Sequence, residues 1–259
     1  MRRFHVIGFS ILLLPLLAPA QSQFDGTWKL DTNSVKLSKE PDVFLLQNGM
    51  YECTCDVPIS IKADGTDQKV TGARHFDAMS VKVIDDYNVE VKIKRDGTVV
   101  RTEKYSISAN GDTLNESWTE PNYGSGHGSG QSTYKRVADG PIDANLLSGS
   151  WRIKKVEASA DAITLTYKVN GNELTMTNPM GQSYTAKLDG TEAPYKDDPE
   201  KATVSVKMLG KNTLKETTKL NGKIFKILKM KVASDGKSMK VVEDCKFSGT
   251  KSSATAMKQ

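Results

Sequence analysis

The stretch FDGTWKLD, residues 24–31, returns in similar form as LSGSWRIK at residues 147–154. Both copies place Gly-x-Trp directly before an alternating apolar run. A tryptophan near the start of a first strand can fill the end of a barrel, and a glycine two residues earlier lets the backbone bend closely around the ring. We therefore interpret each copy as the closure of one β-barrel.

The repetition extends along the chain. The tripeptide SVK at residues 80–82 returns at residues 205–207, and residues 64–118 align with the second half without a gap at one offset of 125. A fixed offset of this kind indicates a tandem duplication. The boundary is placed at residues 137–145, where a Gly-Pro pair breaks any strand.

Asn-Gly and Asp-Gly pairs separate the alternating runs of both halves. Such pairs are the strongest short-range hairpin signal, because both residues tolerate the positive φ that a tight turn requires. Closing a long meander into a barrel removes its edges. The sequence therefore predicts an all-β fold of two tandem antiparallel up-and-down barrels, unit 1 at residues 21–140 and unit 2 at residues 141–259, each long enough to bury its own core.

Residues 1–20 are interpreted as a cleaved signal peptide. Arg2 and Arg3 precede an apolar run, and residues 18–20, Ala-Pro-Ala, fit the rule for signal peptidase. An N-terminal membrane anchor is the alternative, but the run is short for a bilayer span. We expect a secreted or periplasmic protein of a bacterium, with no membrane span after cleavage.

The two units differ in charge: residues 21–140 carry a net charge of −4 and residues 141–259 a net charge of +7. This asymmetry predicts contact between an acidic unit 1 and a basic unit 2, with simple solvated strand faces as the alternative. The lysines of unit 2 are spread along strands rather than clustered with aromatic residues, so no nucleic-acid partner is expected.

Three cysteines are too few for a disulfide scaffold. In an extended strand Cys53 and Cys55 share one face with Tyr51, which favours small buried packing. A bridge between the two would be strained, whereas a bridge from one of them to Cys245 is the alternative in an oxidising compartment. The histidines show no ligand spacing, so no metal site is predicted.

The sequence shows no nucleophile elbow, catalytic triad or paired-carboxylate pattern. The glycine-rich stretch NYGSGHGSGQ, residues 122–131, is followed by no Lys-Ser/Thr and is interpreted as a flexible hairpin tip rather than a phosphate loop. We therefore expect a protein that is not an enzyme and has no catalytic residues and no cofactor.

The stretch FDGTWKLD resembles the opening of lipocalins and fatty-acid-binding proteins, the calycin superfamily. In that group a basic residue of the last strand packs over the tryptophan, and the matching candidates are Arg136 or Lys135 in unit 1 and Lys258 in unit 2. The resemblance implies that six residues close the two barrels: Gly26, Trp28, Arg136, Gly149, Trp151 and Lys258.

The resemblance also implies a small apolar ligand inside a barrel. The candidate contacts lie in unit 1 and are Tyr51, Cys53, Cys55 and Trp118, the last with a core position as its alternative. The competing interpretation is a structural or protein-interaction module, because a small barrel can fill its interior with side chains and act through its outer surface.

Overall fold

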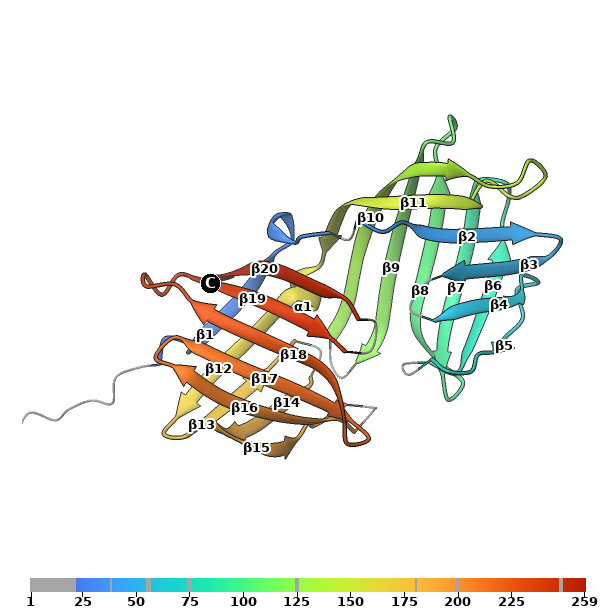
Figure 1. Cartoon of the computed structure of the whole chain (residues 1–259). Coiled ribbons are helices and arrows are strands. Elements are labelled where there is room, and N and C mark those ends of the chain that lie inside the picture. Colours follow the sequence, from blue (N-terminus) through green and yellow to red (C-terminus); the bar gives the residue numbers. More distant parts are fainter. Residues whose placement is uncertain are drawn as a thin grey trace, which may run out of the picture.

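The computed structural model describes residues 22–37, 39–54, 57–73, 76–123, 126–179, 181–198, 201–246 and 249–259 (Figure 1). Two ten-stranded antiparallel sheets, each rolled into a nearly closed barrel, make up the fold. The predicted all-β class with two barrels is therefore confirmed. The expected signal peptide lies outside the described residues.

The first barrel contains the strands β2 to β11, and the second contains β1 and β12 to β20. The strands of the first barrel are β2 (Asp42–Gln47), β3 (Met50–Thr54), β4 (Pro58–Lys62), β5 (Gln68–Lys69), β6 (Ala78–Val83), β7 (Asn88–Arg95), β8 (Thr98–Ile107), β9 (Thr113–Tyr123), β10 (Gly126–Asp139) and β11 (Gly149–Ala158). Those of the second are β1 (Gly26–Asp31), β12 (Thr164–Asn170), β13 (Glu173–Thr177), β14 (Ser183–Lys187), β15 (Asp189–Pro194), β16 (Thr203–Gly210), β17 (Thr213–Leu220), β18 (Lys223–Val232), β19 (Ser238–Cys245) and β20 (Lys251–Lys258).

Helical structure is short among the described residues. The 3₁₀ turn η1 (Thr32–Ser34) follows β1, and the one-turn helix α1 (Ala160–Ile163) joins β11 to β12. No helix of the described residues is long and apolar enough to cross a bilayer.

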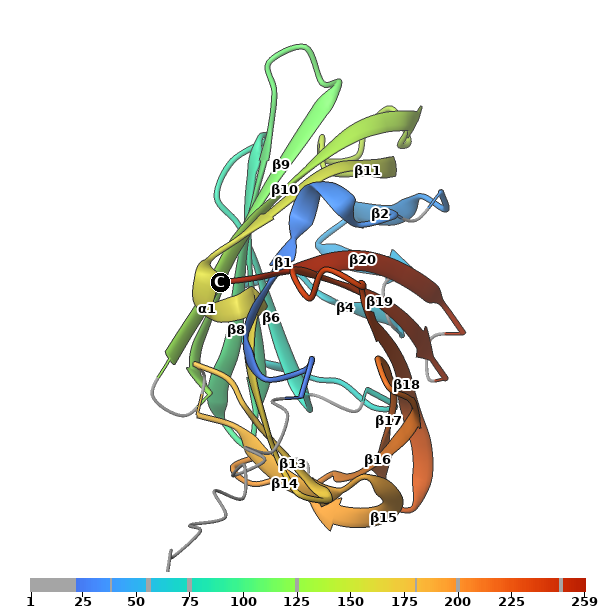
Figure 2. The same cartoon turned by 90° about the vertical axis from the view of Figure 1, so that its left-hand side faces the viewer.

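The two repeats exchange their first strands. β1 lies between β12 and β20 of the second repeat, whereas β11 lies between β10 and β2 of the first repeat. Figure 2 shows β1 beside β20, although these strands come from opposite ends of the chain. The first barrel is therefore one continuous stretch of chain inserted between β1 and the rest of the second barrel.

This arrangement differs from the predicted division into units 21–140 and 141–259. Because β10 and β11 are neighbours joined by residues 140–148, the Gly-Pro pair lies in a connection inside the first barrel. Consecutive antiparallel strands commonly pair in this way. The repeat boundary is thus not a boundary between barrels.

The hairpin turns follow the sequence signals. Asn48, Asp96 and Asn221 each have φ near 50°, and the glycines that follow them are also in the left-handed region. Between the turns, inward positions alternate with outward ones, as in β3, where Tyr51 and Cys53 are buried and their neighbours exposed. The two-residue period of each strand thus separates a buried face from a solvated one.

Each barrel has its own hydrophobic core. Both cores contain the tryptophan of the other repeat's first strand: Trp151 belongs to the first core and Trp28 to the second. The largest side chains that are less than 2 % exposed lie mostly in the second barrel and include Tyr167, Tyr184 and Leu174. Large buried side chains therefore lie in the interior of both barrels.

At each closure a tryptophan of one repeat packs against a cation of the other. Trp28 lies opposite Lys258, whose Nζ is 5.3 Å from the ring centre. Trp151 lies opposite Arg136, whose guanidinium carbon is 4.0 Å from the ring centre, whereas Lys135 is exposed. The interpretation that Arg136 packs over Trp28 is therefore wrong, because strand exchange brings Trp151 to it instead.

The glycine before each tryptophan leaves space for that cation. Gly26 has φ of 121° and Gly149 has φ of 129°, which a side chain rarely adopts. A Cβ at position 26 would lie 2.6 Å from Cε of Lys258, and one at position 149 would lie 2.8 Å from an Nη1 of Arg136. In Gly-x-Trp, the tryptophan therefore fills the end of the barrel, and the glycine leaves space for the cationic side chain that packs over the tryptophan ring.

Candidate functional site

Four charged side chains meet inside the first barrel, on the inward faces of β8 and β9. Arg101 donates to Glu103 at 2.6 Å, to Glu116 at 3.1 Å and to Glu120 at 2.9 Å. We call these four residues the interior charged cluster. The alternation of the strands carries the signal, because Arg101 and Glu103 share a face with the core residue Tyr105.

Two tyrosines complete the interior charged cluster. Tyr105 donates its hydroxyl to Glu103 and Tyr134 donates to Glu116, each at 2.8 Å. Burial raises the pKa of Glu116 above its ordinary value, and the charge of Glu103 adds to this effect while Arg101 opposes it. Because three carboxyl groups surround one guanidinium, the cluster satisfies its own cation and offers little attraction to an anionic ligand.

Trp118 covers the same cluster. The guanidinium carbon of Arg101 is 4.6 Å from the centre of the Trp118 ring. Gly130 lies directly opposite Trp118, and a Cβ there would collide with the indole ring and with the carbonyl of Glu157. A glycine at this point of a strand lets the ring lie across the backbone.

The glycine-rich stretch is therefore mostly strand. The stretch does contain a hairpin, as expected, because β9 extends to Tyr123 and β10 begins at its partner Gly126. The tip is shorter than residues 122–131, since most of these residues belong to the paired strands. Residues 124–125 lie outside the described residues. The glycines of β10 have a packing role, because Gly128 lies opposite Glu120 as Gly130 lies opposite Trp118.

The predicted ligand-binding residues fall into two groups. Tyr51 and Cys53 are 2 % and 4 % exposed in the core of the first barrel. Cys53 is buried as expected, and it is also disulfide-bonded, whereas Cys245 is a free thiol, so the alternative of a bridge to Cys245 does not hold. Cys55 lies outside the described residues. Trp118 is half-buried, and its contact with a ligand stays a prediction.

The interior charged cluster reaches Tyr51 as well. Burial, followed by the charges of Glu103 and Glu116, raises the pKa of the Tyr51 phenol well above its ordinary value. Tyr51 and Trp118 therefore lie near the same interior charges, whereas their contact with a ligand stays a prediction. Among the described residues, no group of His, Cys, Asp or Glu side chains could hold a metal ion.

The second barrel carries a buried carboxyl of its own. Glu216 on β17 is 4 % exposed and accepts a hydrogen bond of 2.7 Å from the hydroxyl of Tyr184. Burial raises the pKa of Glu216, the charge of Lys226 and the Tyr184 hydrogen bond oppose this, and the charge of Glu243 adds to it. Lys226 stands 125 residues after Arg101, so both barrels place a cation at the equivalent position.

We expect the second barrel to lose stability as the pH rises through the titration of Glu216. Its carboxyl has an ordinary pKa of 4.5, and folding raises this pKa, so the folded state keeps a proton that the unfolded state releases. The unfolding free energy is then highest below the unfolded pKa and falls until the pH passes the raised one. Glu216→Gln keeps an acceptor for Tyr184, so it should flatten this dependence and stabilise the barrel at neutral pH.

Urea unfolding of both proteins from acid to neutral pH is the measurement. A variant with the same pH dependence as the parent chain would contradict the assignment to Glu216. Lys226 and Glu243 act on the same carboxyl and are both present in the variant, so the difference between the two curves isolates Glu216.

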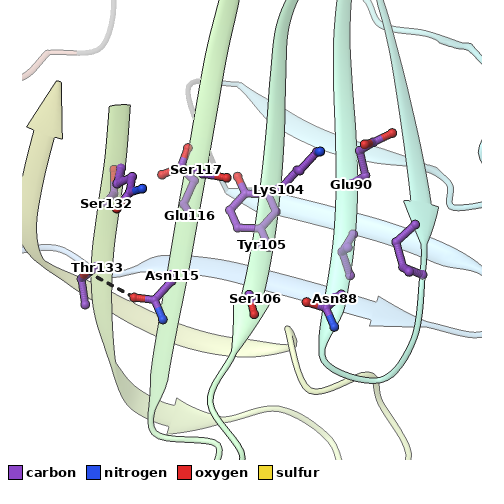
Figure 3. Close-up of a pocket in the computed structure, with 13 residues that line it drawn as sticks. Asn88, Glu90, Lys104, Tyr105, Ser106, Asn115, Glu116, Ser117, Ser132 and Thr133 are labelled. Atoms are coloured by element: carbon purple, nitrogen blue, oxygen red, sulfur yellow. Dashed lines mark hydrogen bonds between the residues drawn. The ribbon is translucent and has the colours of Figure 1, made fainter. Parts of the chain in front are cut away.

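A pocket of about 490 Å³ lies on the outer wall of the first barrel, over β7 to β10 (Figure 3). Its volume falls within the ordinary range of small-molecule sites. Strand register arranges much of its lining in two rows of direct cross-strand neighbours. The first row is Asn88, Ser106, Asn115 and Thr133.

Two members of the first row are hydrogen-bonded to each other, because the Thr133 hydroxyl donates to Asn115 at 3.3 Å, as Figure 3 shows. The second row is displaced from the first by two residues on each strand. Its members are Glu90, Lys104, Ser117 and Gln131. The second row carries no net charge, because it holds one carboxylate and one ammonium group.

Sequence reasoning did not single out these eight residues. The alternation does assign Glu90 to the face opposite Val89 and Val91, and this is the signal available from one strand. Bringing four strands into one pocket depends on their register, which requires the sheet. The pocket therefore has no sequence motif of its own.

No family model matches the chain, and no curated protein matches it. The resemblance to the calycin superfamily accordingly rests on Gly-x-Trp and its packing cation. The structure supports the coarser statement, two nearly closed all-β barrels in tandem.

Proposed function

We propose that this chain is a non-enzymatic binding protein and that the first barrel binds a polar ligand in the pocket on its outer wall. The observation that carries the proposal is the double row of hydrogen-bonding side chains over β7 to β10, described above. This favours the interpretation of filled barrels with a functional outer surface over that of a ligand inside a barrel.

The interior supports this choice. Large side chains occupy both cores, and the polar interior of the first barrel is engaged in its own ion pairs and hydrogen bonds. An apolar ligand would have to displace that network and leave buried polar groups unpaired, which costs about 1–3 kcal/mol for each group. A ligand on the outer wall has no such cost.

The chemistry of the pocket favours an uncharged ligand that carries several hydroxyl groups, such as a glycan. Asparagine, glutamine, serine and threonine side chains each donate and accept hydrogen bonds, as hydroxyl groups do. Glu90 and Lys104 lie opposite each other and balance in charge.

Titration of the mature chain with neutral oligosaccharides, followed by nuclear magnetic resonance of the side-chain amides, tests this proposal. We expect shifts at Asn88, Asn115 and Gln131, and about a tenfold loss of affinity in Asn115→Leu, since one or two hydrogen bonds are lost. Thr185→Leu is the control, because Thr185 belongs to an exposed polar pair on the outer wall of the second barrel. Equal affinity in Asn115→Leu and the parent chain would refute the site.

A ligand bound inside the first barrel is the second candidate, and it is favoured by the partly exposed ring of Trp118 over Arg101. An apolar fluorophore that quenches Trp118 and leaves Asn88 and Asn115 unshifted would support this candidate instead. We further propose that the protein is secreted or periplasmic and lipocalin-like, as the first residues and Gly-x-Trp predict. The contact between an acidic unit 1 and a basic unit 2 stays a prediction.

A further inference from the structure

A row of lysines crosses the outer wall of the second barrel. Lys207, Lys215 and Lys229 are direct cross-strand neighbours on β16, β17 and β18. Lys231 and Lys240 form the next row on β18 and β19. All five are exposed. These residues, together with exposed Lys211 in the turn between β16 and β17, are called the lysine wall. The strands that carry it, β16 to β19, are orange to red in Figure 1.

The lysine wall places like charges against one another. Directly opposed like charges on neighbouring strands destabilise a sheet. Among the described residues, none of the six lysines forms an ion pair with a carboxylate. The neighbouring carboxylate of Asp189, opposite Lys207, accepts its hydrogen bond from Thr191. The fold itself therefore gains nothing from this arrangement.

The first barrel provides an internal comparison, because the same wall is built there in the same register 125 residues earlier. Lys82, Glu90 and Lys104 are direct neighbours and alternate in sign. In the first barrel, the six residues that correspond to the lysine wall together carry no net charge, whereas the lysine wall carries six positive charges. The six corresponding residues are Lys82, Asp86, Glu90, Lys104, Ser106 and Asn115.

We propose that the lysine wall is a docking surface for an anionic lipid membrane. It is made of lysines, and β16 to β19 contain no arginine and a single aromatic residue, Phe225. Nucleic-acid recognition uses bidentate arginines and stacking rings, whereas ammonium groups act as point charges toward a diffuse anionic surface.

An exposed apolar side chain at the rim supports the choice of a membrane. Leu209 lies between Lys207 and Lys211 at the end of β16, at an irregularity of the strand, and it is 49 % exposed. Lys211 follows it in the turn. A leucine flanked by lysines suits the boundary between headgroups and acyl chains, where apolar burial adds to electrostatic attraction. A soluble polyanion offers no apolar region in which this leucine could be buried.

Flotation of the mature chain with vesicles tests the proposal. We expect binding to equimolar phosphatidylcholine and phosphatidylglycerol at low salt, none to phosphatidylcholine alone, and release as salt screens the charges. Lys215→Glu restores the sign that Glu90 has in the other barrel. It should weaken binding about 30-fold, because each lysine near such a surface contributes about a fivefold factor and the reversal changes the charge by two units.

The same substitution should raise the midpoint of thermal unfolding, because two like-charge pairs become opposite-charge pairs. A merely structural lysine would not give tighter folding together with weaker binding. Lys82→Glu is the control: it makes the same Lys-to-Glu change in the corresponding row of the first barrel, at the counterpart of Lys207 and directly opposite Glu90. We expect it to lower stability slightly and to leave vesicle binding unchanged.

Several results would overturn the proposal. They are equal vesicle binding by Lys215→Glu and the parent chain, equal loss in Lys82→Glu, or tighter binding to heparin or duplex DNA than to the vesicles. Concentration-dependent dimers that Lys215→Glu abolishes would assign the lysine wall to a second copy of the chain instead. None of these experiments depends on the pocket of the first barrel, so the two proposals fail separately.

Discussion

Trp151→Ala is expected to unfold the first barrel and to leave the second barrel folded, although Trp151 belongs to the second repeat. Its ring is completely buried, its Nε1 donates to the carbonyl of Leu147 at 2.8 Å, and Arg136 covers its face. Truncating a buried tryptophan costs about 3–5 kcal/mol. This is a large share of a typical unfolding free energy of about 5–15 kcal/mol.

Hydrogen exchange followed by mass spectrometry reports the two barrels separately and is the measurement for this variant. Trp28→Ala is the matched control, since Trp28 makes the equivalent hydrogen bond to Phe24 at 2.8 Å and should loosen the second barrel alone. Faster exchange in β12 to β20 of Trp151→Ala, with β2 to β10 protected, would show that the strands are not exchanged.

The cation that packs over each tryptophan ring allows a second test of the strand exchange. Arg136→Ala and Trp151→Ala remove the same contact, so their combined loss should fall short of the sum by about 0.5–2 kcal/mol. Arg136→Ala and Trp28→Ala act in different barrels and should add. The opposite pattern would be expected for unexchanged repeats, in which Arg136 would cover Trp28.

The fold class followed from features that act over a few residues. Asn48-Gly49 and its counterparts require positive φ, and the alternation between turns separates a buried face from an exposed one. These local rules determine hairpins and their register. The closing tryptophans could be named for the same reason. Their basic partners were named from the resemblance to the calycin superfamily, which placed Arg136 over Trp28 instead of Trp151.

These local rules could not predict which barrel β1 and β11 each join. Both strands have the same local pattern, Gly-x-Trp followed by alternation, so each fits both barrels. The connection of residues 140–148 favours the observed choice, because it lets β11 form a hairpin with β10 at a small cost in loop entropy. A Gly-Pro pair in that connection marks a turn as readily as a domain boundary.

The candidate sites show the same division. Arg101 and Glu103 stand on a face that is otherwise apolar, which signals an interior charged cluster from one strand alone. The partners Glu116 and Glu120, the outer pocket and the lysine wall arise only when several strands lie in register. A comparison of the two repeats does reveal the lysine wall, because Glu90 becomes Lys215 at the shared offset.

Residues 37–163 are expected to fold without the rest of the chain. This fragment holds β2 to β11, with both Trp151 and Arg136, so it contains a complete barrel and its core. We expect one cooperative transition in urea, monitored by circular dichroism. A fragment of residues 21–140 lacks β11 and can close only if β1 replaces it, so it should be the less stable of the two; equal stability would contradict the observed strand membership.

Residues 159–259 should not fold cooperatively alone but should do so when a peptide of residues 22–36 is added. The fragment lacks β1, the strand that lies between β12 and β20, and it lacks the buried plug of Phe24 and Trp28. Burying a large apolar side chain contributes about 1.5–3 kcal/mol, and the paired strand adds its backbone hydrogen bonds. The same peptide with Trp28→Ala keeps the hydrogen bonds but loses the plug, so it should bind far more weakly. Circular dichroism during titration decides this: a fragment that folds without the peptide, or equal binding of both peptides, would show that β1 is dispensable for closing the second barrel.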